Sequence, residues 1–508
     1  MTVYDVIVIG AGGAGAPLAA RLSEDPDRTV LLLEAGPTPS GTDDFPAELL
    51  DARSLRGAVP GHPHVWNFRA DLTGDRPYTV ARGRVLGGST SVNGGYFVRA
   101  RREDFDRWSA GGANEWSSER VLPVWRRLET DLQYGDTPVH GGSGPMLVSR
   151  PSLDHPASVA FAAAAKELGY PEEADKNADG APGYGPVPMN VTDGMRWNTG
   201  IAYVNPVRHR PNLTVRGLTS VRRVVMRGQR AVGVEVDSLG DISVIHGGEV
   251  VLAAGAVTSP HLLLLSGIGP ADQLRRHGIK VVQALPGVGS EFSDHPNVPL
   301  AWTPVPELQG SATQTMTMSL NLTSEDSELP GDLEILQFVT PMSGLLGLRE
   351  QTRDLAFLAS VQSVRSHGTI SLKSADPRMP PRIRYNYLAD EVDRRRMREV
   401  VRAAAALLAT PAFLRLVKHG PIDNATLHDD AHLDGWLRRH LTTAMHLSSS
   451  ARFGPGEDPA SVVDQYGRVY GVTGLRVADT SILPSAPLRG PAATAVLIGE
   501  LVAEFMRR

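Results

Sequence analysis

A glycine-rich turn near the start of the chain constrains its fold more than any other feature. Residues 3–9 form a short apolar run, typical of a buried parallel strand, and lead into Gly10-Ala11-Gly12-Gly13-Ala14-Gly15, a match to G-x-G-x-x-G. A helical pattern follows, and a second apolar run at residues 30–33 ends at Glu34. Strand, glycine turn, helix and strand in this order predict the first βαβ unit of a dinucleotide-binding fold.

Each part of this unit has a physical role in holding a dinucleotide. Gly10 makes the tight turn, Gly12 lets the backbone approach a pyrophosphate, and Gly15 permits close packing of helix on strand. The helix N-terminus offers free N–H groups and its positive dipole end to phosphates. Glu34 stands 34 − 10 = 24 residues after Gly10, where an acid hydrogen-bonds the hydroxyls of an unphosphorylated ribose. The unit therefore favours FAD or NAD over a purely structural turn, and its spacing leaves those two open.

The composition excludes several other classes of protein. The chain has 508 residues, a net charge of −5 and no cysteine, so disulfides, thiolate nucleophiles and cysteine-bound metals are excluded. Charges of both signs are interspersed, so no basic face indicates nucleic acid as a partner. The N-terminus lacks a basic segment, and no apolar run reaches about 18 residues. We therefore expect a cytoplasmic protein with no transmembrane segment.

Further strand and helix patterns follow along the chain. Residues 212–236 predict hairpin or meander strands, and residues 249–256 predict a buried strand that leads into a helix at 259–265. The less apolar stretch 296–440 contains a predicted strand and an arginine-rich helix. This pattern predicts a separate, inserted domain. A strand at 475–478 and an apolar helix at 493–505 then return to the first domain.

Three segments resemble the glucose–methanol–choline (GMC) family of flavin oxidoreductases. Residues 81–95, ARGRVLGGSTSVNGG, are similar to its first signature, and residues 255–269, GAVTSPHLLLLSGIG, to its second. Residues 458–484, DPASVVDQYGRVYGVTGLRVADTSILP, resemble the C-terminal part of the family. Shorter similarities are VGSEFSDHP at 288–296 and GTISLKSADP at 368–377. The resemblance extends over essentially the whole chain, and it implies FAD as the dinucleotide.

The resemblance also implies the fold and the cofactor contacts. We expect an α/β protein with a Rossmann-like FAD-binding domain of the GMC type and a discontinuous α+β substrate-binding domain, an antiparallel sheet plus helices. The FAD-binding domain takes residues 1–155, 205–300 and 441–508, and the substrate-binding domain takes 156–204 and 301–440. The residues implied to contact FAD are Gly10, Gly12, Gly13, Ala14, Gly15, Glu34, Ala35, Arg82, Gly87, Gly88, Ser89, Asn93, Gly94, Gly95, Val221, Ala254, Gly255, Asp479, Ala492 and Thr494.

Some family members tether the flavin through a histidine of the first signature. The matching position here is Val92, so we expect a non-covalent flavin.

Alcohol oxidation requires a base for the hydroxyl proton, and histidine suits that role because its pKa lies near neutrality. The family histidine matches His446. The second family residue, histidine or asparagine, matches Gly490, because 490 − 446 = 44 residues separate the pair in the family. Gly490 has no side chain to donate a hydrogen bond, so the neighbouring Arg489, a polar group from 296–440 or the substrate itself would compensate. The alternative for Arg489 is a surface arginine in a turn.

The resemblance implies an enzyme that oxidises a small-molecule alcohol. NGGYF at 93–97, HGGSGP at 140–145 and LRGP-x-AT at 488–494 are similar to the mycofactocin-associated branch of the family. That branch is implied to reoxidise the reduced form of a peptide-derived redox cofactor and to pass electrons to an acceptor other than oxygen. Oxygen, a quinone and a redox partner all stay open as acceptors. The alternatives are a GMC alcohol oxidase or dehydrogenase that tailors a natural product, a lyase of the hydroxynitrile-lyase type, and a non-catalytic flavoprotein.

Other polar clusters are interpreted as structural. His428, Asp429, Asp430 and His432 contain metal-ligand types, but Asp favours the first turn of a helix, so we expect a polar helix start and no metal site. His295, which ends the VGSEFSDH segment, is expected to pack near the cofactor domain rather than to perform chemistry.

Overall fold

The glycine unit predicted from the sequence forms the centre of a seven-stranded sheet. The computed structural model describes residues 3–308 and 315–508. In it, β1 (Tyr4–Ile9), α1 (Gly15–Leu22) and β2 (Val30–Leu33) follow one another as expected. β1 pairs in parallel with β2 and with β13 (Asp241–Leu252), and its apolar side chains are buried. Burial on both faces explains why these strands read as continuous apolar runs.

The remaining strands of this sheet come from distant parts of the chain. β10 (Leu213–Arg216) pairs in parallel with β2, and β24 (Leu475–Val477) pairs in parallel with the end of β13. The first half of β13 instead pairs antiparallel with β12 (Arg230–Ser238), which pairs with β11 (Thr219–Arg227). The predicted meander and the predicted C-terminal strand are therefore confirmed.

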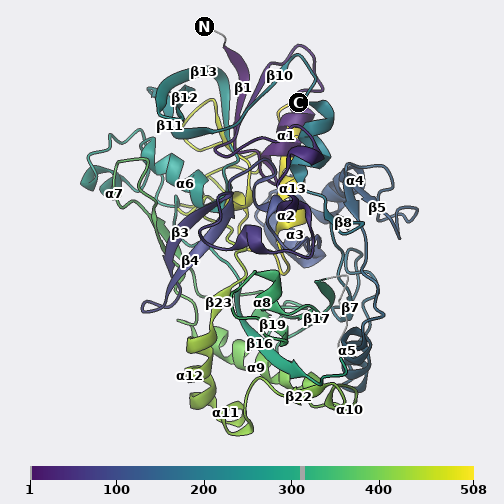
Figure 1. Ribbon diagram of the computed structural model, residues 1–508. Coiled ribbons are helices and arrows are strands. Elements are labelled where there is room, and N and C mark those ends of the chain that lie inside the picture. The colour runs from purple at the N-terminus through teal and green to yellow at the C-terminus, as the bar shows by residue number, and fades with distance from the viewer. Residues whose placement is uncertain (1–2, 309–314) are drawn as a thin grey trace.

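A second sheet is antiparallel and occupies the other end of the molecule (Figure 1). α9 (Glu391–Leu408), the predicted arginine-rich helix, packs against three of its strands. The strands, in spatial order, are β22 (Val417–His419), β16 (Pro296–Pro304), β19 (Leu355–Val361), β18 (Leu333–Phe338), β17 (Met316–Leu322) and β7 (Tyr184–Pro186), with β23 (Thr442–Thr443) also on β16. The α/β class and the antiparallel sheet with helices agree with the expectation from the sequence.

A small sheet joins segments far apart in the chain. β20 (Thr369–Ser371) pairs with β21 (Arg382–Arg384), β21 pairs with β3 (Val65–Asp71), and β3 pairs with β4 (Pro77–Gly83). Part of the stretch 296–440 therefore pairs with strands near the N-terminus. The domain boundaries proposed from the sequence stay a prediction.

The remaining α-helices and β-strands of the described chain lie between and around these sheets. They are α2 (Ala47–Leu50), α3 (Arg102–Ser109), α4 (Ser118–Leu128), α5 (Pro156–Glu167), α6 (Gly255–Leu265), α7 (Ala271–Arg276), α8 (Met342–Leu345), α10 (Pro411–Leu414), α11 (Asn424–His428), α12 (Asp430–His440), α13 (Ala492–Phe505), β5 (Glu129–Asp131), β6 (Met146–Val148), β8 (Val191–Thr192), β9 (Met195–Arg196), β14 (Ile268–Gly269) and β15 (Gln283–Ala284). Asp429 accepts a hydrogen bond from the backbone N–H of His432 and caps α12, which confirms the predicted polar helix start.

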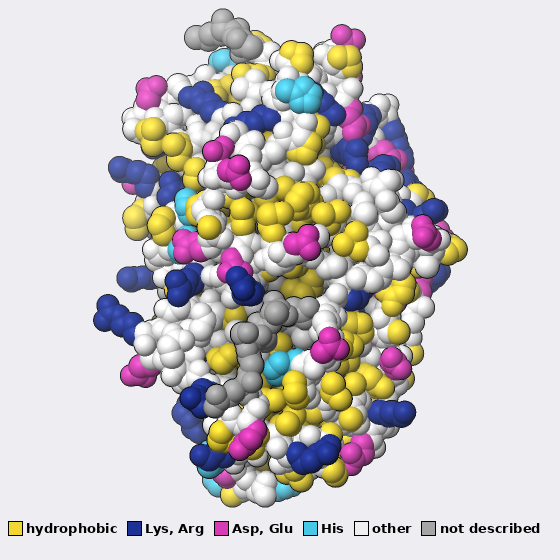
Figure 2. All heavy atoms as spheres, turned by 45° about the vertical axis from the view of Figure 1, so that its right-hand side comes forward, with side chains coloured by type: hydrophobic (Ala, Val, Ile, Leu, Met, Phe, Trp, Pro, Cys, Tyr) yellow, Lys and Arg dark blue, Asp and Glu magenta, His cyan; other side chains and the backbone are white. Residues whose placement is uncertain are grey.

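The surface carries charges of both signs. On the face drawn in Figure 2, Lys and Arg side chains alternate with Asp and Glu, and apolar side chains gather between them. Within the residues that the structure describes, no helix combines the length and apolar character needed to cross a membrane.

Helices α1 and α13 pack side by side, although they come from opposite ends of the chain, and α1 also packs against β1 and β2 (Figure 1). A methyl group at Gly499 would overlap the carbonyl oxygen of Ala14, so this contact needs glycine. The next residue, Glu500, is buried and accepts hydrogen bonds from Arg21 at 2.9 Å and from the Tyr203 hydroxyl at 2.8 Å. The close approach at Gly499 and the hydrogen bond between Glu500 and Arg21 therefore both link the two helices.

Gly499→Ala should destabilise the protein by about 1–3 kcal/mol, because the added methyl forces α13 away from α1. The matched control is Gly435→Ala in α12, where a methyl meets only the flexible end of Arg439 at 3.5 Å. That control should stabilise by about 0.5–1 kcal/mol, the usual gain for alanine over glycine in a helix interior. Chemical denaturation of both variants measures the two effects, and equal effects of the same sign would contradict the packing described.

Candidate active site

The glycine turn leaves free space in front of one of its residues. Gly10 has φ +97°, and a Cβ there would lie 2.6 Å from the carbonyl oxygen of Ala253, while a Cβ at Gly15 would overlap Gly10. The packing of the protein itself therefore requires both glycines. A Cβ at Gly12, by contrast, would meet only the Cα of Gly88 at an ordinary 3.7 Å. The packing of the protein itself therefore does not require a glycine at this position. Gly12 stays partly exposed, which leaves room for the close ligand approach predicted from the sequence.

Glu34 lies at the end of β2 and is buried. Its carboxylate accepts hydrogen bonds from the N–H groups of Ala11 at 3.0 Å and of Gly36 at 2.9 Å. Burial raises the pKa of Glu34 to about 7. The side chain thus ties the glycine turn to the next strand, and each carboxylate oxygen keeps a lone pair for a ribose hydroxyl.

The loop from Arg82 to Gly95 lies directly on the glycine turn. Gly87 donates its N–H to the carbonyl of Ala11 at 2.8 Å, and a Cβ at Gly88 would lie 2.7 Å from the Cα of Gly12. Positive φ values of +88° and +53° at these two glycines explain why the loop needs them. At its far end, Asn93 accepts a hydrogen bond from the N–H of Gly95 at 3.0 Å. Main-chain atoms of two distant segments therefore meet without side chains between them.

The C-terminal residues that are predicted to contact the cofactor lie in the same region as the glycine turn. Asp479 is buried, and its carboxylate accepts hydrogen bonds from the N–H of Gly255 at 2.9 Å and from the hydroxyl of Ser259. Gly13 lies against Ala495, near the start of α13. The following predicted cofactor residues stay partly exposed within this otherwise buried region: Gly10, Gly12, Gly13, Ala35, Arg82, Ser89, Asn93, Gly94, Val221, Ala254, Gly255 and Ala492. Several of these residues follow the C-terminal ends of β1 and β13, the edge at which an open α/β sheet binds a dinucleotide.

Val92, the position of the flavin tether in some family members, is buried and lies near Gly57. It offers no atom for a covalent bond to a flavin.

His446 lies beside a second histidine that the sequence placed outside the chemistry. The Nδ1 atoms of His446 and His295 are 2.9 Å apart, and the two rings meet edge to face at 83°. One oxygen of Asp294 accepts the backbone N–H groups of both histidines, each at 2.7 Å. His295 is fully buried, whereas His446 keeps partial exposure. The pair is 446 − 295 = 151 residues apart in the chain, and no sequence spacing predicts it.

Both imidazoles are neutral at pH 7. Burial lowers the pKa of His295 to about 3. Burial also lowers the pKa of His446 well below 6.5, and the neighbouring His295 and Arg82 lower it further. A neutral His446 is ready to accept a proton.

Position 490 faces the edge of His446 that bears Nε2. A Cβ at Gly490 would lie 3.4 Å from Cε1 and 3.5 Å from Nε2 of His446. The structure therefore brings together the two positions paired in the sequence, and the residue type at 490 decides what stands beside Nε2. Because residue 490 is glycine, it places no side chain next to the Nε2 edge of His446.

Arg489 is buried, so the alternative of a surface arginine is wrong. Its guanidinium donates to the carboxylate of Glu173 and to the backbone carbonyl of Lys176. Lys176 is itself buried, donates to Glu173 at 2.7 Å, and has a pKa lowered by burial to about 8. Sequence reasoning missed this network because its members are distant in the chain. It fixes the turn 488–490 next to His446.

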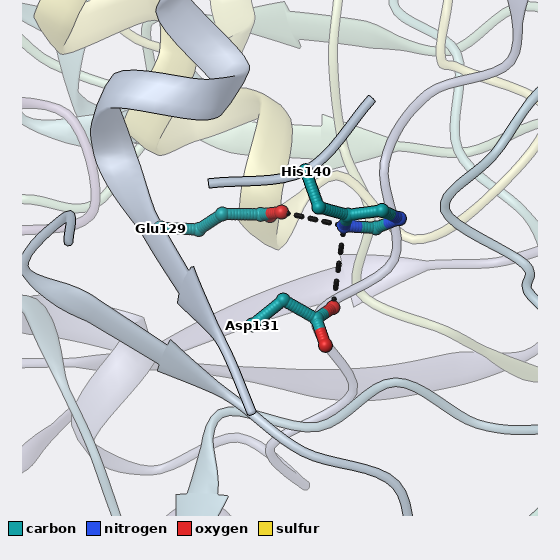
Figure 3. Close-up of side chains that lie close together, drawn as sticks. All are labelled: Glu129, Asp131 and His140. Atoms are coloured by element: carbon teal, nitrogen blue, oxygen red, sulfur yellow. Dashed lines mark hydrogen bonds and ion pairs between the residues drawn. The ribbon is translucent and has the colours of Figure 1, made fainter. Parts of the chain in front are cut away.

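A further cluster outside this site combines His140 with Glu129 and Asp131 (Figure 3). Nδ1 of His140 lies 2.7 Å from Glu129, and Nε2 lies 2.8 Å from Asp175. Burial lowers the pKa of His140, but its hydrogen bonds to three carboxylates outweigh burial and raise the pKa to about 10.

Two arginines complete this cluster. Arg99 pairs with Glu129, and Arg150 pairs with Asp131, each at 2.6 Å. A protonated imidazole cannot bind a metal ion, and the arginines already balance the carboxylates. The cluster is therefore a buried ion-pair network rather than a metal centre.

The sequence is similar to known proteins over almost its whole length. Family models described as GMC oxidoreductase match residues 4–297 and 364–499. An uncharacterized GMC-type oxidoreductase in the thcA 5′ region of Rhodococcus erythropolis is 40% identical over 500 residues, covering 98% of this chain and 97% of that protein. An oxygen-dependent choline dehydrogenase of Brucella anthropi is 34% identical over 548 residues, covering 99% and 95%.

Solved structures agree with these sequence matches. The crystal structure of pyridoxine 4-oxidase from Mesorbium loti superposes with a TM-score of 0.91 at 26% identity, covering 99% of each chain. A formate oxidase of Aspergillus oryzae studied for FAD modification has a TM-score of 0.91 at 23% identity, over 100% of this chain and 98% of that one, and it supports the fold alone. FAD is the cofactor that this architecture binds. The chain belongs to the GMC oxidoreductase family, whose members act on CH–OH groups.

Proposed function

We propose that this protein oxidises an alcohol to a carbonyl compound and that His446 takes the hydroxyl proton. The observation that carries this proposal is a neutral, partly exposed imidazole whose Nε2 edge faces the position without a side chain, Gly490. The positive charge of Arg82, at the start of the first-signature loop, is close enough to lower the pKa of the His446 ring. The base therefore stands near the predicted flavin loop.

The residues of this chain have separate tasks in such a reaction. Bound FAD supplies the acceptor for the hydride that leaves the alcohol carbon. His446 accepts the proton, and Asp294 fixes its backbone. The largely buried surroundings of the imidazole lower the local dielectric, which strengthens its electrostatic interactions with a developing alkoxide. We propose a non-covalent flavin, because valine occupies position 92.

The missing side chain at position 490 bears on the substrate. Arg489 uses both terminal nitrogens in contacts within the protein, so its guanidinium is already engaged. We infer that a polar group of the substrate itself enters the space beside Gly490. A reduced peptide-derived cofactor of the mycofactocin type, with electrons passed to an acceptor other than oxygen, is the substrate that the three short sequence similarities support. The cytoplasmic location stays a prediction.

The relatives named above suggest competing substrates, and the missing side chain also favours a lyase of the hydroxynitrile-lyase type. Anaerobic mixing with reduced mycofactocin, choline, pyridoxine and aryl alcohols, followed at the flavin absorption band, separates these cases. Bleaching by one compound identifies the substrate class, and admitting air then tests oxygen as acceptor. Turnover without any change in the flavin band would support the lyase.

His446→Ala should slow flavin reduction by about 10²–10⁴-fold while FAD stays bound, because it removes the general base. Stopped-flow absorbance measures the rate, and the spectrum measures cofactor content. The control is His432→Ala, whose side chain on α12 is 73% exposed and should leave the rate unchanged. A near-normal rate in the His446 variant would rule out the assignment.

The pH dependence of flavin reduction should reflect the lowered pKa of His446. The base works only when deprotonated, so the rate falls as the pH drops through the pKa of the folded protein. Since that pKa lies well below 6.5, the rate should stay constant through pH 6.5 and decline only at lower pH. A midpoint at or above 6.5, measured at saturating alcohol, would contradict a buried neutral base.

A further inference from the structure

The two imidazoles of the site share one hydrogen bond, and this restricts where their protons lie. A neutral imidazole carries one N–H and one lone pair. Because both rings are neutral and their Nδ1 atoms are 2.9 Å apart, one Nδ1 donates and the other accepts. The two possible arrangements have opposite consequences for catalysis.

The first arrangement disables the base, and the second arrangement prepares it. If Nδ1 of His446 accepts, the ring carries its hydrogen on Nε2, and that nitrogen cannot take a proton from an alcohol. If Nδ1 of His446 donates, Nε2 keeps a lone pair, and this lone pair lies on the edge that faces Gly490. The direction of one hydrogen bond therefore decides whether His446 can act.

The surroundings of His295 favour the second arrangement. Its ring is fully buried, and the backbone carbonyls of Pro487 and Gln362 both act on it to favour protonation. Carbonyl groups only accept hydrogen bonds, so they favour an N–H on the nitrogen turned toward them. Nδ1 of His295 already faces His446, so Nε2 is the nitrogen left to carry this hydrogen. Nε2 of His295 makes no hydrogen bond within ordinary geometric limits. A lone pair on that nitrogen would still be repelled by the carbonyl oxygens of Pro487 and Gln362, whereas an N–H would be attracted to them.

We propose that His295 is a positioning residue that holds His446 in the tautomer protonated at Nδ1, leaving its Nε2 free to take the alcohol proton. The role of His446 as base rests on the proposed function. In the reaction the hydroxyl O–H bond breaks, an Nε2–H bond forms, and the ring becomes an imidazolium. Its Nδ1–H then donates a charge-assisted hydrogen bond to His295, which stabilises the new charge.

The backbone is built to keep this pair in place. One oxygen of Asp294 accepts the N–H groups of both histidines, so two segments distant in the chain share a single anchor. This arrangement fixes the ring separation independently of any bound alcohol, as preorganisation requires.

The tautomer can be read directly in the holoenzyme. Histidine is labelled with ¹⁵N, and long-range ¹H–¹⁵N spectra distinguish nitrogens that carry hydrogen from nitrogens that carry a lone pair. The spectra of His446→Asn and His295→Asn assign the two rings by their missing signals. We expect hydrogen on Nδ1 of His446 and on Nε2 of His295. Hydrogen on Nε2 of His446 would overturn the proposal.

Two substitutions at position 295 test the consequence for the rate. In His295→Asn the amide oxygen can take the place of Nδ1 as acceptor, so flavin reduction should stay within several-fold of the wild-type rate. His295→Leu removes the acceptor and should lower the reduction rate by about 10- to 100-fold, the usual cost of losing a group that orients a histidine. KM and FAD content should change little. A Leu variant at least as fast as the Asn variant would contradict the proposal.

Loss of a buried histidine needs its own control. His261 of α6 is also buried, with an unpartnered Nε2, and His261→Leu measures the general effect of such a loss. The tautomer spectra separate this inference from the proposed function. If His446→Ala leaves flavin reduction unchanged while the spectra show the expected tautomers, the base role fails and the tautomer assignment stands. If the spectra show the opposite tautomer, the inference fails whatever the rates.

Discussion

The cofactor half of the molecule depends on main chain packed directly against main chain. Gly10 meets Ala253, Gly88 meets Gly12, and Gly499 meets Ala14, in each case at a distance that leaves no room for a side chain. These contacts gather the ends of β1 and β13, the start of α1 and the first-signature loop into one small volume. Backbone N–H groups from several segments can then point at one anion, which an arrangement of flexible side chains would achieve only at an entropic cost.

The chemistry depends on a different kind of interaction, hydrogen bonds and ion pairs between buried polar groups. Asp294 joins the two histidines, and the Arg489–Glu173–Lys176 network holds the turn that carries Gly490. In a low dielectric, such groups are strongly oriented, and an unpaired one would be costly. The same burial that keeps His446 neutral therefore also requires the surrounding charges to balance one another.

The sequence predicted those parts of the site that lie in local patterns. The glycine turn, Glu34 and the pairing of positions 446 and 490 follow from spacing or from the family motifs. The contact between His295 and His446 does not, because it arises from two segments that β16 and β23 bring together. The network around His140 was missed for a similar reason, since Asp175 approaches from another part of the chain. Local propensity also gave no sign that β20 and β21 pair beside β3 rather than within the larger antiparallel sheet.

The pairing of β24 with β13 and the packing of α13 on α1 have a consequence for how the protein is made. A ribosome synthesises the chain from β1 onward at about 5–20 residues per second, so roughly 25–100 s pass before β24 and α13 exist. During that time the central parallel sheet has an unpaired edge, and α1 exposes the face that α13 later covers. Until then the nascent chain lacks the C-terminal residues that are predicted to contact FAD. A chain that ends before β24 and α13 therefore leaves backbone N–H and C=O groups of β13 unpaired and one face of α1 uncovered, which favours pairing with other chains.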